Sequence, residues 1–328
     1  MTIHFKITNE KRHEGLTQIR AQGFKNFKAV NCMVAAFAGA VHDMAIIQSV
    51  RKFYAETEFF HPEHTLSCGQ VFRFERDGGG WFVMSGSDIA YILKSKEDAG
   101  YDIYCSDESY FRKYFDLSTD YGAIIQGVSV NDFMRDAINF GRGIRILRQP
   151  HFETLISFII SANNNILRIQ GILKRMCEAL GEKCEFVGKI YHAFPTPQAI
   201  ASRGAEFFRE LGAGYRADSI VQAARKVADG FDLDAVQNLC MTDARAALMS
   251  FKGVGPKVCD CILLFSYGRS EAFPVDTWME KVYNQHFAKE GGAPKTRTEI
   301  ARYFYSMFGD LSGYAQQYLF YYKRSGRV

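Results

Sequence analysis

Cysteine patterns that bind metals are missing from this sequence. Its eight cysteines stand at positions 32, 68, 105, 177, 184, 240, 259 and 261, so no two of them form a C-x-x-C pair and none follows residue 261. Structural zinc sites and iron–sulfur clusters usually need such spacings, and the sequence therefore predicts neither. We expect reduced, mostly buried thiols in an intracellular protein and no cofactor.

Apolar runs long enough to cross a membrane are also missing. The nearest approach is the stretch 32–41, whereas a membrane-spanning helix needs roughly 18 apolar residues. This stretch follows a basic segment and ends in Ala-Gly-Ala, but the segment before it is too long for a typical signal peptide. We therefore predict no membrane partner.

Charge is distributed unevenly along the 328 residues. Basic residues exceed acidic ones by four in residues 1–40 and by seven in residues 141–328, whereas acidic residues exceed basic ones by seven in residues 41–140. The basic C-terminal part suits a polyanionic partner, although a surplus of this size is modest. The length predicts two or three domains rather than one small core.

The first half of the chain predicts a basic extension followed by a sheet. Residues 1–43 show no sustained period, so we expect an extension that is disordered or that reflects a start assigned too far upstream. Residues 46–105 predict antiparallel strands, because 70–75 alternates, 77–80 has turn composition, and 81–84 and 88–93 follow. In residues 106–141 the apolar residues recur at helical spacing, and residues 130–132 have the composition of a helix cap. We predict an α+β domain over residues 44–145.

From residue 148 to the end we predict only helices, in a second domain over residues 146–328. The apolar run 152–160 stops at three asparagines, which are poor helix formers. A loop at 212–216 carries an aromatic residue and a cation at its tip. The remaining helices are expected at 166–180, at 195–211 as two short helices, and at 217–228, 242–251, 298–308 and 312–322.

Residues 248–276 hold the most informative pattern in the chain. Gly253, Val254 and Gly255 form a tight turn between two apolar helical runs. Such a turn presents bare N–H groups beside the start of a helix, which suits a phosphate and reads no base. Glycine turns between helices are also common in pure scaffolds, so the turn alone leaves both interpretations open.

Lys257 and Asp276 add chemistry to this turn. A lysine near the positive end of a helix dipole and beside apolar residues has a destabilised ammonium, and its neutral amine can form a Schiff base. The alternative is an exposed lysine that touches only solvent or phosphate. Thr277 and Glu280 have capping-box spacing, so we predict that Thr277 caps the next helix and leaves the Asp276 carboxylate free for chemistry.

These residues resemble a known family. The segment K-G-V-G-P-K-V-C-D-C followed by P-V-D is similar to the helix-hairpin-helix, glycine/proline-rich, aspartate superfamily of base-excision DNA glycosylases, and within it to the 8-oxoguanine DNA glycosylases. The resemblance spans roughly residues 46–325. Its other motifs are S-C-G-Q-V-F-R-F at 67–74, S-A-N-N-N-I-L-R at 161–168, L-G-A-G-Y-R-A at 211–217 and Y-A-Q-Q-Y-L-F at 314–320.

The resemblance implies a fold and a reaction. The fold is mainly α, with an antiparallel, TATA-binding-protein-like sheet domain before an all-helical helix-hairpin-helix core. By similarity, Lys257 attacks the sugar C1′ of the damaged nucleotide, forms a Schiff base and permits β-elimination, while Asp276 assists by stabilising positive charge and moving protons. The enzyme is then a DNA N-glycosylase with abasic-site lyase activity that excises 8-oxoguanine, together with formamidopyrimidines, opposite cytosine.

The resemblance also assigns binding roles to residues. The damaged base contacts Gly69, whose carbonyl accepts the N7 hydrogen, and Gln316, Phe320 and Cys261. The opposite cytosine is read by Asn163, Arg168 and Arg216, with Tyr215 as the wedge. Gly253, Val254 and Gly255 bind phosphate, and the carbonyls of Met249, Phe251 and Val254 are candidates for a monovalent cation. Trp278 departs from the family, because many eukaryotic members have histidine there.

Each of these assignments has a simpler alternative. Gly69 could be an ordinary turn glycine, Phe320 and Cys261 could be core residues, and the three asparagines could serve only to end a helix. The rival functions are a hairpin glycosylase for another damaged base and a non-catalytic helix-hairpin-helix DNA-binding protein. We expect a monomer that binds double-stranded DNA containing oxidised purines. It would lie in the cytoplasm with the nucleoid of a bacterium, or in the nucleus of a eukaryote.

Overall fold

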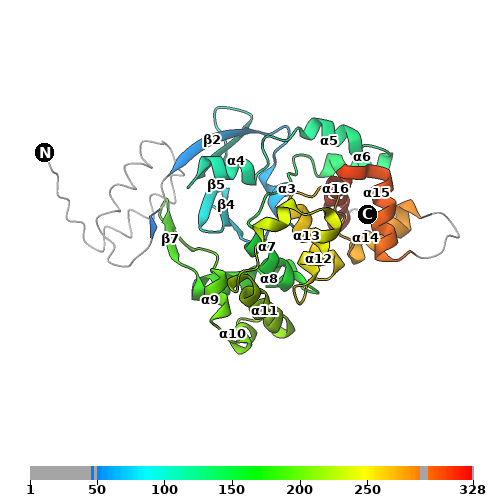
Figure 1. The fold of residues 1–328 in the computed structure, drawn as a ribbon. Helices are drawn as coiled ribbons and strands as arrows, with labels where there is room; N and C mark the ends of the chain where they lie inside the picture. The colour runs from blue at the N-terminus through cyan, green and yellow to red at the C-terminus, as the bar shows by residue number, and fades with distance from the viewer. Residues whose placement is uncertain (1–45, 48–49, 289–294, 327–328) are drawn as a thin grey trace.

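Five antiparallel strands form the sheet of the N-terminal half of the protein. The structure is a computed structural model and describes residues 46–47, 50–288 and 295–326. The predicted extension 1–43 therefore lies outside the described residues. The strand order is β2-β6-β5-β4-β3 (Figure 1). The strands are β2 (Arg51–Glu56), β3 (Phe74–Asp77), β4 (Gly80–Ser85), β5 (Asp88–Lys94) and β6 (Gly100–Cys105).

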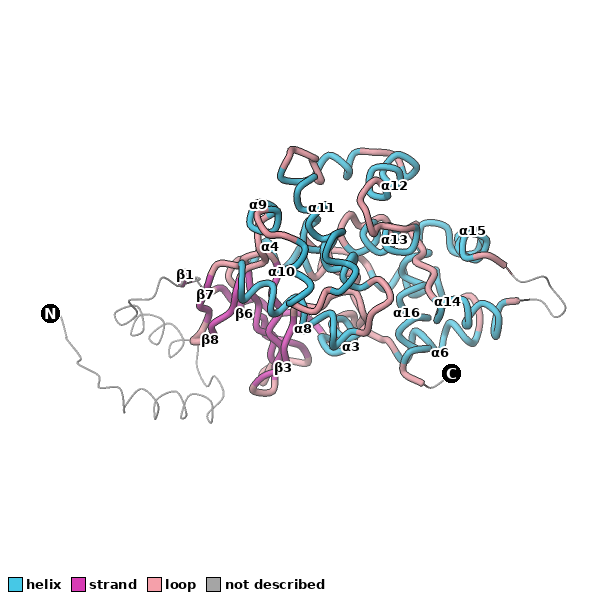
Figure 2. Tube along the Cα trace, turned by 90° about the horizontal axis from the view of Figure 1, so that it is seen from below, coloured by secondary structure: helices cyan, strands magenta, loops and turns pink. Residues whose placement is uncertain are grey.

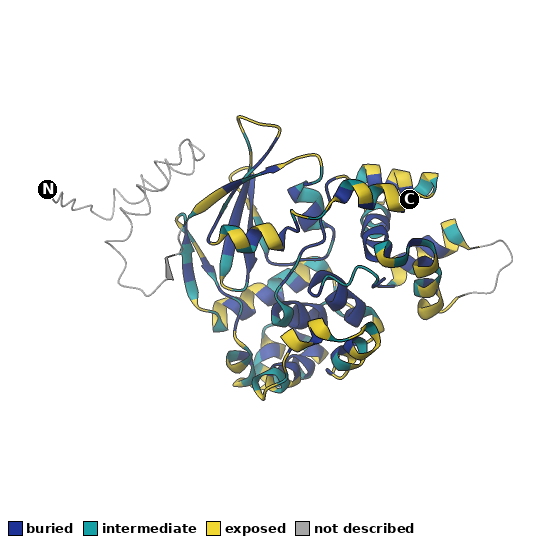
Figure 3. Ribbon diagram, turned by 45° about the horizontal axis from the view of Figure 1, so that its top comes forward, coloured by how far each residue is buried: buried dark blue, intermediate teal, exposed yellow. Residues whose placement is uncertain are grey.

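Both faces of the central strands are covered, which explains their nearly continuous apolar sequences. Trp81 and Val83 of β4 pack into one core with the helix α4 (Glu108–Tyr114), while Phe82 and Met84 pack into a core on the opposite face. Successive side chains of a strand point to opposite faces, so each face receives every second residue. Figure 3 shows the buried residues in dark blue along these strands.

The N-terminal half departs from the predicted run of strands in two places. Residues 62–67 form a helix, α3 (Pro62–Ser67), in which Pro62 occupies the first turn and His61 accepts a hydrogen bond from the backbone of His64. The strand predicted at 70–75 begins only at Phe74. Gln70 is buried and its amide bonds the carbonyls of Thr65 and Arg145 at 2.9 and 2.7 Å, so a side chain satisfies backbone groups there instead of a sheet.

The rest of the chain is helical apart from one hairpin. The first helices are α5 (Tyr121–Val128), α6 (Asp132–Phe140), α7 (His151–Ser161) and α8 (Ile166–Leu180). Next come α9 (Pro197–Ala201), α10 (Ala205–Glu210), the 3-10 turn η1 (Gly214–Arg216), α11 (Ala217–Ala228) and the 3-10 turn η2 (Asp234–Asn238). The last are α12 (Met241–Met249), α13 (Pro256–Phe265), α14 (Thr277–Val282), the π-turn η3 (Tyr283–Phe287), α15 (Arg297–Phe308), η4 (Gly309–Leu311) and α16 (Ser312–Arg324).

The prediction that only helices follow residue 148 is wrong. Strands β7 (Lys183–Phe186) and β8 (Lys189–His192) form a hairpin, and β7 also pairs in parallel with β1 (Ile46–Ile47). The turn residues Val187 and Gly188 both have positive φ, which suits a two-residue hairpin turn. The hairpin buries Cys184 and Phe186 against the second face of the large sheet, and Figure 2 shows its strands beside that sheet.

One hydrophobic core joins the two halves of the sequence. Helix α6 packs against α16, and the core between them includes Met134 and Ile138 from the first half and Phe304, Tyr318 and Leu319 from the second. Figures 1 and 2 both show α6 beside the C-terminal helices. Within the described ranges, no helix has the length and apolar character that crossing a membrane requires.

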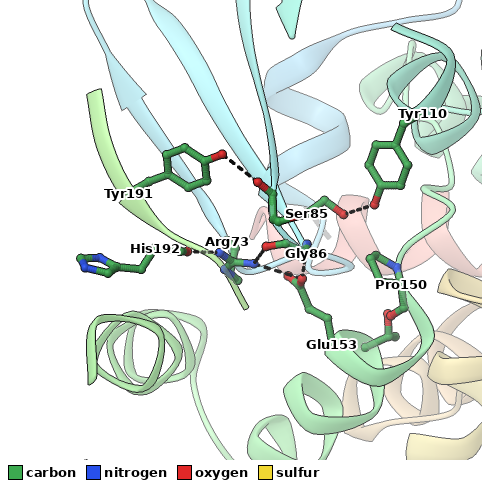
Figure 4. A network of polar contacts seen from close by, with 10 residues as sticks. Arg73, Ser85, Gly86, Tyr110, Pro150, Glu153, Tyr191 and His192 are labelled. Carbon is green, nitrogen blue, oxygen red and sulfur yellow. Dashed lines mark hydrogen bonds and ion pairs between the residues drawn. The ribbon is translucent and has the colours of Figure 1, made fainter. Parts of the chain in front are cut away.

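A buried ion pair fastens the sheet to the helical part (Figure 4). Nη1 of Arg73 lies 3.0 Å from Oε2 of Glu153 on α7, and Nη2 donates to the carbonyl of His192 at 2.6 Å. The same Glu153 oxygen accepts the N–H of Gly86, in the turn between β4 and β5, at 2.7 Å. Both side chains are buried, so the pair links the residue before β3, the β4–β5 turn, β8 and α7.

Candidate active site

The glycine turn links α12 to α13 as the sequence predicts. Gly253 has φ +89°, a backbone angle that favours glycine, and a methyl group there would lie only 3.0 Å from the Ser219 side chain of α11. A methyl group at Gly255 would meet no atom within 4 Å. No side chain caps α13, which leaves the first N–H groups of this helix without a side-chain partner.

Lys257 lies in the first turn of α13 and is half-buried. Its Nζ lies 5.6 Å from the centre of the Phe158 ring, which is an attractive distance for an ammonium over an aromatic face. Cys261 lies one turn later on the same side and is buried. Burial raises the pKa of the Cys261 thiol to about 11, and the positive charge of Lys257 partly opposes this rise. The thiol is therefore neutral at physiological pH.

The prediction that Thr277 caps α14 is wrong. Asp276 is the cap: its Oδ1 accepts the N–H groups of Trp278 at 3.0 Å and Met279 at 2.9 Å. The backbone of Asp276 is extended, and the helix begins with Thr277 itself, so the aspartate reaches the free N–H groups first. Its other oxygen, Oδ2, accepts no hydrogen bond from the described residues. Asp276 and Lys257 both act electrostatically on the Cys261 thiol, which places the two charges near one another.

Gly69 and Phe320 lie in contact although they are far apart in the sequence. Gly69 has φ +87°, and a methyl group there would lie 3.1 Å from the Phe320 ring. Gln316, one turn before Phe320 on α16, is 4% exposed and donates from Nε2 to the carbonyl of Pro274 at 3.3 Å. Because Pro274 stands two residues before Asp276, this bond brings Gln316 of α16 beside the segment that carries Asp276.

Arg324 is a neighbour of this group that the sequence analysis missed. Its Nη2 donates to the carbonyl of Ser67, and its Cζ lies 5.5 Å from the centre of the Phe320 ring. Gln316, Phe320 and Arg324 are spaced four residues apart, so they share one face of α16. That spacing is the signal in the sequence that could have pointed to Arg324.

Two loops form a second cluster of predicted residues. The loop between α7 and α8 holds Asn163, which is exposed with φ +49°, and the turn η1 holds Tyr215, whose side chain is 67% exposed. The Tyr215 hydroxyl donates to the carbonyl of Ala162 at 3.1 Å, and Arg168 donates to the carbonyl of Gly212 at 3.1 Å. These bonds hold the two loops side by side, with the tyrosine ring outward.

Arg216 departs from the exposed position that a DNA-reading side chain suggests. It is 4% exposed, and its guanidinium donates to the carbonyls of Ala162 at 2.7 Å, Asn163 at 2.6 Å and Ala213 at 3.3 Å. Arg216 therefore fixes the loop that carries Asn163. A guanidinium has five N–H groups, so two remain after these three bonds.

A cavity of about 1180 Å³ lies away from Lys257. Its lining comes from α4, from the start of α7, from η2 and from the residues that follow α13, including Arg148, His151 and Tyr267. The lysine occupies the other end of α13, roughly 15 Å away for a ten-residue helix. Size alone therefore does not identify a reactive centre in this molecule, and the residues clustered around Lys257 are the candidate.

Two family models match the chain. Residues 52–155 match the model described as 8-oxoguanine DNA glycosylase, N-terminal domain, and residues 156–305 match the model described as HhH-GPD superfamily base excision DNA repair protein. The first match ends inside α7 and the second extends into α15. Together they cover the sheet, the glycine turn, Lys257 and Asp276.

Similar proteins carry matching descriptions. The N-glycosylase/DNA lyase OGG1 of Arabidopsis thaliana is 31% identical over 276 residues, which cover 78% of this chain and 75% of that protein. The N-glycosylase/DNA lyase of Saccharomyces cerevisiae is 36% identical over 193 residues, which cover 55% of this chain, so the match spans about half (51%) of the yeast protein. The 8-oxoguanine glycosylase/lyase of Clostridium acetobutylicum, in complex with double-stranded DNA containing cytosine opposite 8-oxoguanine, is 35% identical with a TM-score of 0.76, over 85% of this chain and 99% of that one.

Proposed function

The chain belongs to the 8-oxoguanine DNA glycosylase family, and on that premise we propose that it excises 8-oxoguanine from duplex DNA and then cleaves the strand at the abasic site. The observation that supports this most directly is the cluster of Lys257, Cys261 and Asp276 beside Gln316, Phe320 and Gly69. One side of this cluster carries a nucleophile and a carboxylate, and the other carries groups that suit a flat, polar base.

Lys257 supplies the nucleophile in this proposal. The neutral amine attacks C1′ of the nucleotide, and the bond from C1′ to the base breaks with its electron pair leaving on the base, which takes up a proton. Opening of the C1′–O4′ bond then gives the protonated Schiff base. Loss of a C2′ proton expels the 3′ phosphate by β-elimination. The base must first leave the helical stack, because C1′ and the base edges are hidden in duplex DNA.

Asp276 supplies negative charge where the sugar becomes positive. Its Oδ1 is held by two backbone N–H groups of α14, which fixes the orientation of the carboxylate, and Oδ2 accepts no hydrogen bond from the described residues. A preorganised charge of this kind stabilises the transition state without reorganising during the reaction. Lys257 and Asp276 form no direct ion pair among the described residues, which is consistent with a sugar lying between them.

The base is recognised by groups on both sides of the pocket. Gly69 offers a backbone carbonyl to the N7 hydrogen that 8-oxoguanine has and guanine lacks. Gln316 retains a buried Oε1 without a hydrogen-bond partner in the described chain, which suits the Watson–Crick edge of a base. Phe320 and Cys261 cover the two faces of the ring. Formamidopyrimidines present similar donors and extend the substrate range.

The two-loop cluster receives the cytosine left opposite the extruded base. Tyr215 enters the gap, and Arg168, Asn163 and the remaining N–H groups of Arg216 meet the O2 and N3 acceptors of cytosine. Excision should therefore be faster with cytosine opposite the lesion than with adenine, guanine or thymine. Equal single-turnover rates for all four duplexes would remove this assignment.

The glycine turn holds the DNA backbone in the same proposal. Gly253, Val254 and Gly255 bind a phosphate of the damaged strand, and Gly255 leaves open space for it. The carbonyls of Met249 and Val254 accept no hydrogen bond from the described residues, and that of Phe251 accepts one from Val254 at 3.1 Å, so all three retain lone pairs for a monovalent cation. The protein acts as a monomer on DNA in the bacterial cytoplasm or the eukaryotic nucleus.

Borohydride trapping tests the reaction. Wild-type protein is mixed with duplexes carrying one 8-oxoguanine or one undamaged guanine opposite cytosine, and reduction of the Schiff base leaves a stable adduct. We expect an adduct only on the damaged duplex and none with Lys257→Gln. Binding without an adduct in the wild-type protein would support a non-catalytic hairpin protein. A third set of duplexes carries an alkylated or ring-opened base, and an adduct on these alone would support a different glycosylase.

A further inference from the structure

The Arg324 guanidinium lies beside Gly69 and Phe320, two groups that contact the base in the proposed pocket. Its Nη1 would be 3.0 Å from a methyl group at Gly69, and its Cζ lies 5.5 Å from the centre of the Phe320 ring. Nη2 is fixed by its hydrogen bond to the carbonyl of Ser67, at the end of α3. Arg324 therefore adjoins the glycine whose carbonyl is proposed to test N7.

Nη1 of Arg324 is buried and has no hydrogen-bond partner among the residues that the structure describes. Leaving a buried donor unpaired is unfavourable, and more so for a charged group. Oε1 of Gln316, two turns earlier on the same face of α16, is also buried without a partner in the described part of the chain. One face of this helix thus presents an unpaired donor and an unpaired acceptor around Phe320.

We propose that Arg324 donates a hydrogen bond from Nη1 to the C8 oxygen of 8-oxoguanine and so determines base specificity together with Gly69. The inference rests on the proposed function. The lesion differs from guanine at two adjacent ring atoms, since N7 carries a hydrogen and C8 carries an oxygen. The carbonyl of Gly69 can test only the first difference. A donor beside Gly69 tests the second, because guanine has a C–H group there that accepts no hydrogen bond.

The charge on Arg324 strengthens this discrimination. Hydrogen bonds from a guanidinium are roughly twice as strong as those between neutral groups, and the site excludes water from Nη1. A site built to bond a polar atom rejects an analogue that lacks it, because the buried donor is then left unpaired. A role for Arg324 as a simple tether between α16 and Ser67 makes a different prediction, since a tether supports the binding of guanine and 8-oxoguanine alike.

The test is equilibrium binding with turnover removed by Lys257→Gln. Fluorescence anisotropy gives Kd for duplexes with 8-oxoguanine or guanine opposite cytosine, in full-length protein that also carries Arg324→Met or, as the control, Arg302→Met. Arg302 is exposed on α15, so the control removes one positive charge away from the pocket. We expect Arg324→Met to lower the preference for 8-oxoguanine about tenfold with the Kd for guanine unchanged, and Arg302→Met to leave the preference intact. Equal weakening of both duplexes, or an unchanged preference, would overturn the proposal.

A second pair of duplexes tests the same contact with Arg324 in place. 7-Deaza-8-oxoguanine keeps the C8 oxygen but has no N7 hydrogen for Gly69, and 7-deazaguanine lacks both. Protein with Lys257→Gln alone should bind the 7-deaza-8-oxoguanine duplex about tenfold more tightly than the 7-deazaguanine duplex. Equal affinities would refute the role of Arg324 even if Arg324→Met does not fold.

Failure of the proposed function would give a different result, because the wild-type protein would then form no borohydride adduct with 8-oxoguanine DNA.

Discussion

Asp276 caps α14 with one oxygen atom and, in the proposed mechanism, stabilises the sugar with its negative charge, and substitution can separate these two roles. Asparagine caps a helix about as well as aspartate but carries no negative charge. We expect Asp276→Asn to melt within a degree or two of the wild-type temperature and to lose about 10²–10³ in the single-turnover rate of base excision. Asp276→Ala should lose the same rate and, in addition, about 1 kcal/mol of stability from the missing cap. A full excision rate in Asp276→Asn would show that the carboxylate only caps α14.

Tyr215 places an aromatic ring in solvent, where it contributes little to the fold. Its hydroxyl bonds the Ala162 carbonyl, and the Arg216 guanidinium lies 4.3 Å from its ring centre. We expect Tyr215→Ala to weaken binding of lesion DNA by about 1–3 kcal/mol, the range for base–aromatic stacking, while the melting temperature stays nearly constant. Tyr215→Phe is the matched control, because it keeps the ring. If both variants weaken binding equally, the hydroxyl contact matters and the wedge role is wrong.

The helical hairpin of α12 and α13 contains a titrating pair of its own. Asp260 on α13 contacts Arg245 on α12, and burial raises the pKa of Asp260 to about 7 although Arg245 partly opposes the rise. An unfolded aspartate has a pKa near 3.9, so between about pH 4 and 7 the folded protein binds a proton that the unfolded chain does not. The contribution of this group to stability therefore decreases as pH rises through that window.

Replacing Asp260 with asparagine tests this pH dependence. We expect the melting temperature of Asp260→Asn, relative to the wild-type protein, to be higher at pH 8 than at pH 5. Other titrating groups are shared by both proteins, so the difference between them isolates Asp260. A difference that stays constant from pH 5 to 8, or that changes in the opposite direction, would show that the Arg245 contact outweighs burial.

The Arg73–Glu153 pair acts between elements, because it joins the sheet, the β7–β8 hairpin and α7. Removing one partner of a buried pair leaves the other charge uncompensated, which costs about 3–5 kcal/mol. We expect Arg73→Met to lose stability in that range in urea unfolding. The exposed pair of Arg112 and Glu108 offers a control, since Arg112→Met should cost less than about 1 kcal/mol. Comparable losses in the two variants would contradict a special role for the buried pair.

Element by element, the sequence predicted what local patterns determine. The strands β4 and β5, the boundaries of α11 and the glycine turn follow from neighbouring residues. The family prediction is confirmed by the models and relatives that match the chain. The hairpin β7–β8 was missed because four-residue strands give little periodicity, and β7 pairs with a segment far away in the sequence. The cap on α14 was missed because Asp276 and Thr277 are both good caps, and only backbone geometry decides between them.

At the scale of the whole molecule, the site depends on contacts that no local pattern contains. Gly69 and Phe320 stand on opposite sides of the predicted domain boundary, yet their contact forms part of the proposed base pocket. The family resemblance assigned roles to both residues but gave no distance between them. Arg324 lies outside the quoted motifs, so its unpaired Nη1 became visible only once α3 and α16 were placed together.

The shared core predicts how the chain behaves when it is divided. The interface between α6 and α16 buries Met134 and Ile138 against Tyr318 and Leu319, and Gln317 bonds the carbonyl of Cys68 at 2.8 Å. Residues 146–328 alone would expose this apolar surface and leave buried polar groups unpaired. We expect that fragment to show no cooperative thermal transition by circular dichroism, although it contains Lys257 and Asp276.

Co-expression with residues 44–145 completes the test. The two fragments together should form a soluble complex, recover a cooperative transition and regain borohydride trapping, because both the second core and the proposed pocket then have all their parts. A fragment 146–328 that unfolds cooperatively by itself would show that the α6–α16 contact is a domain interface rather than a common core. In that case the pocket residues Gly69 and Phe320 would be brought together by docking of two independent domains instead of by folding.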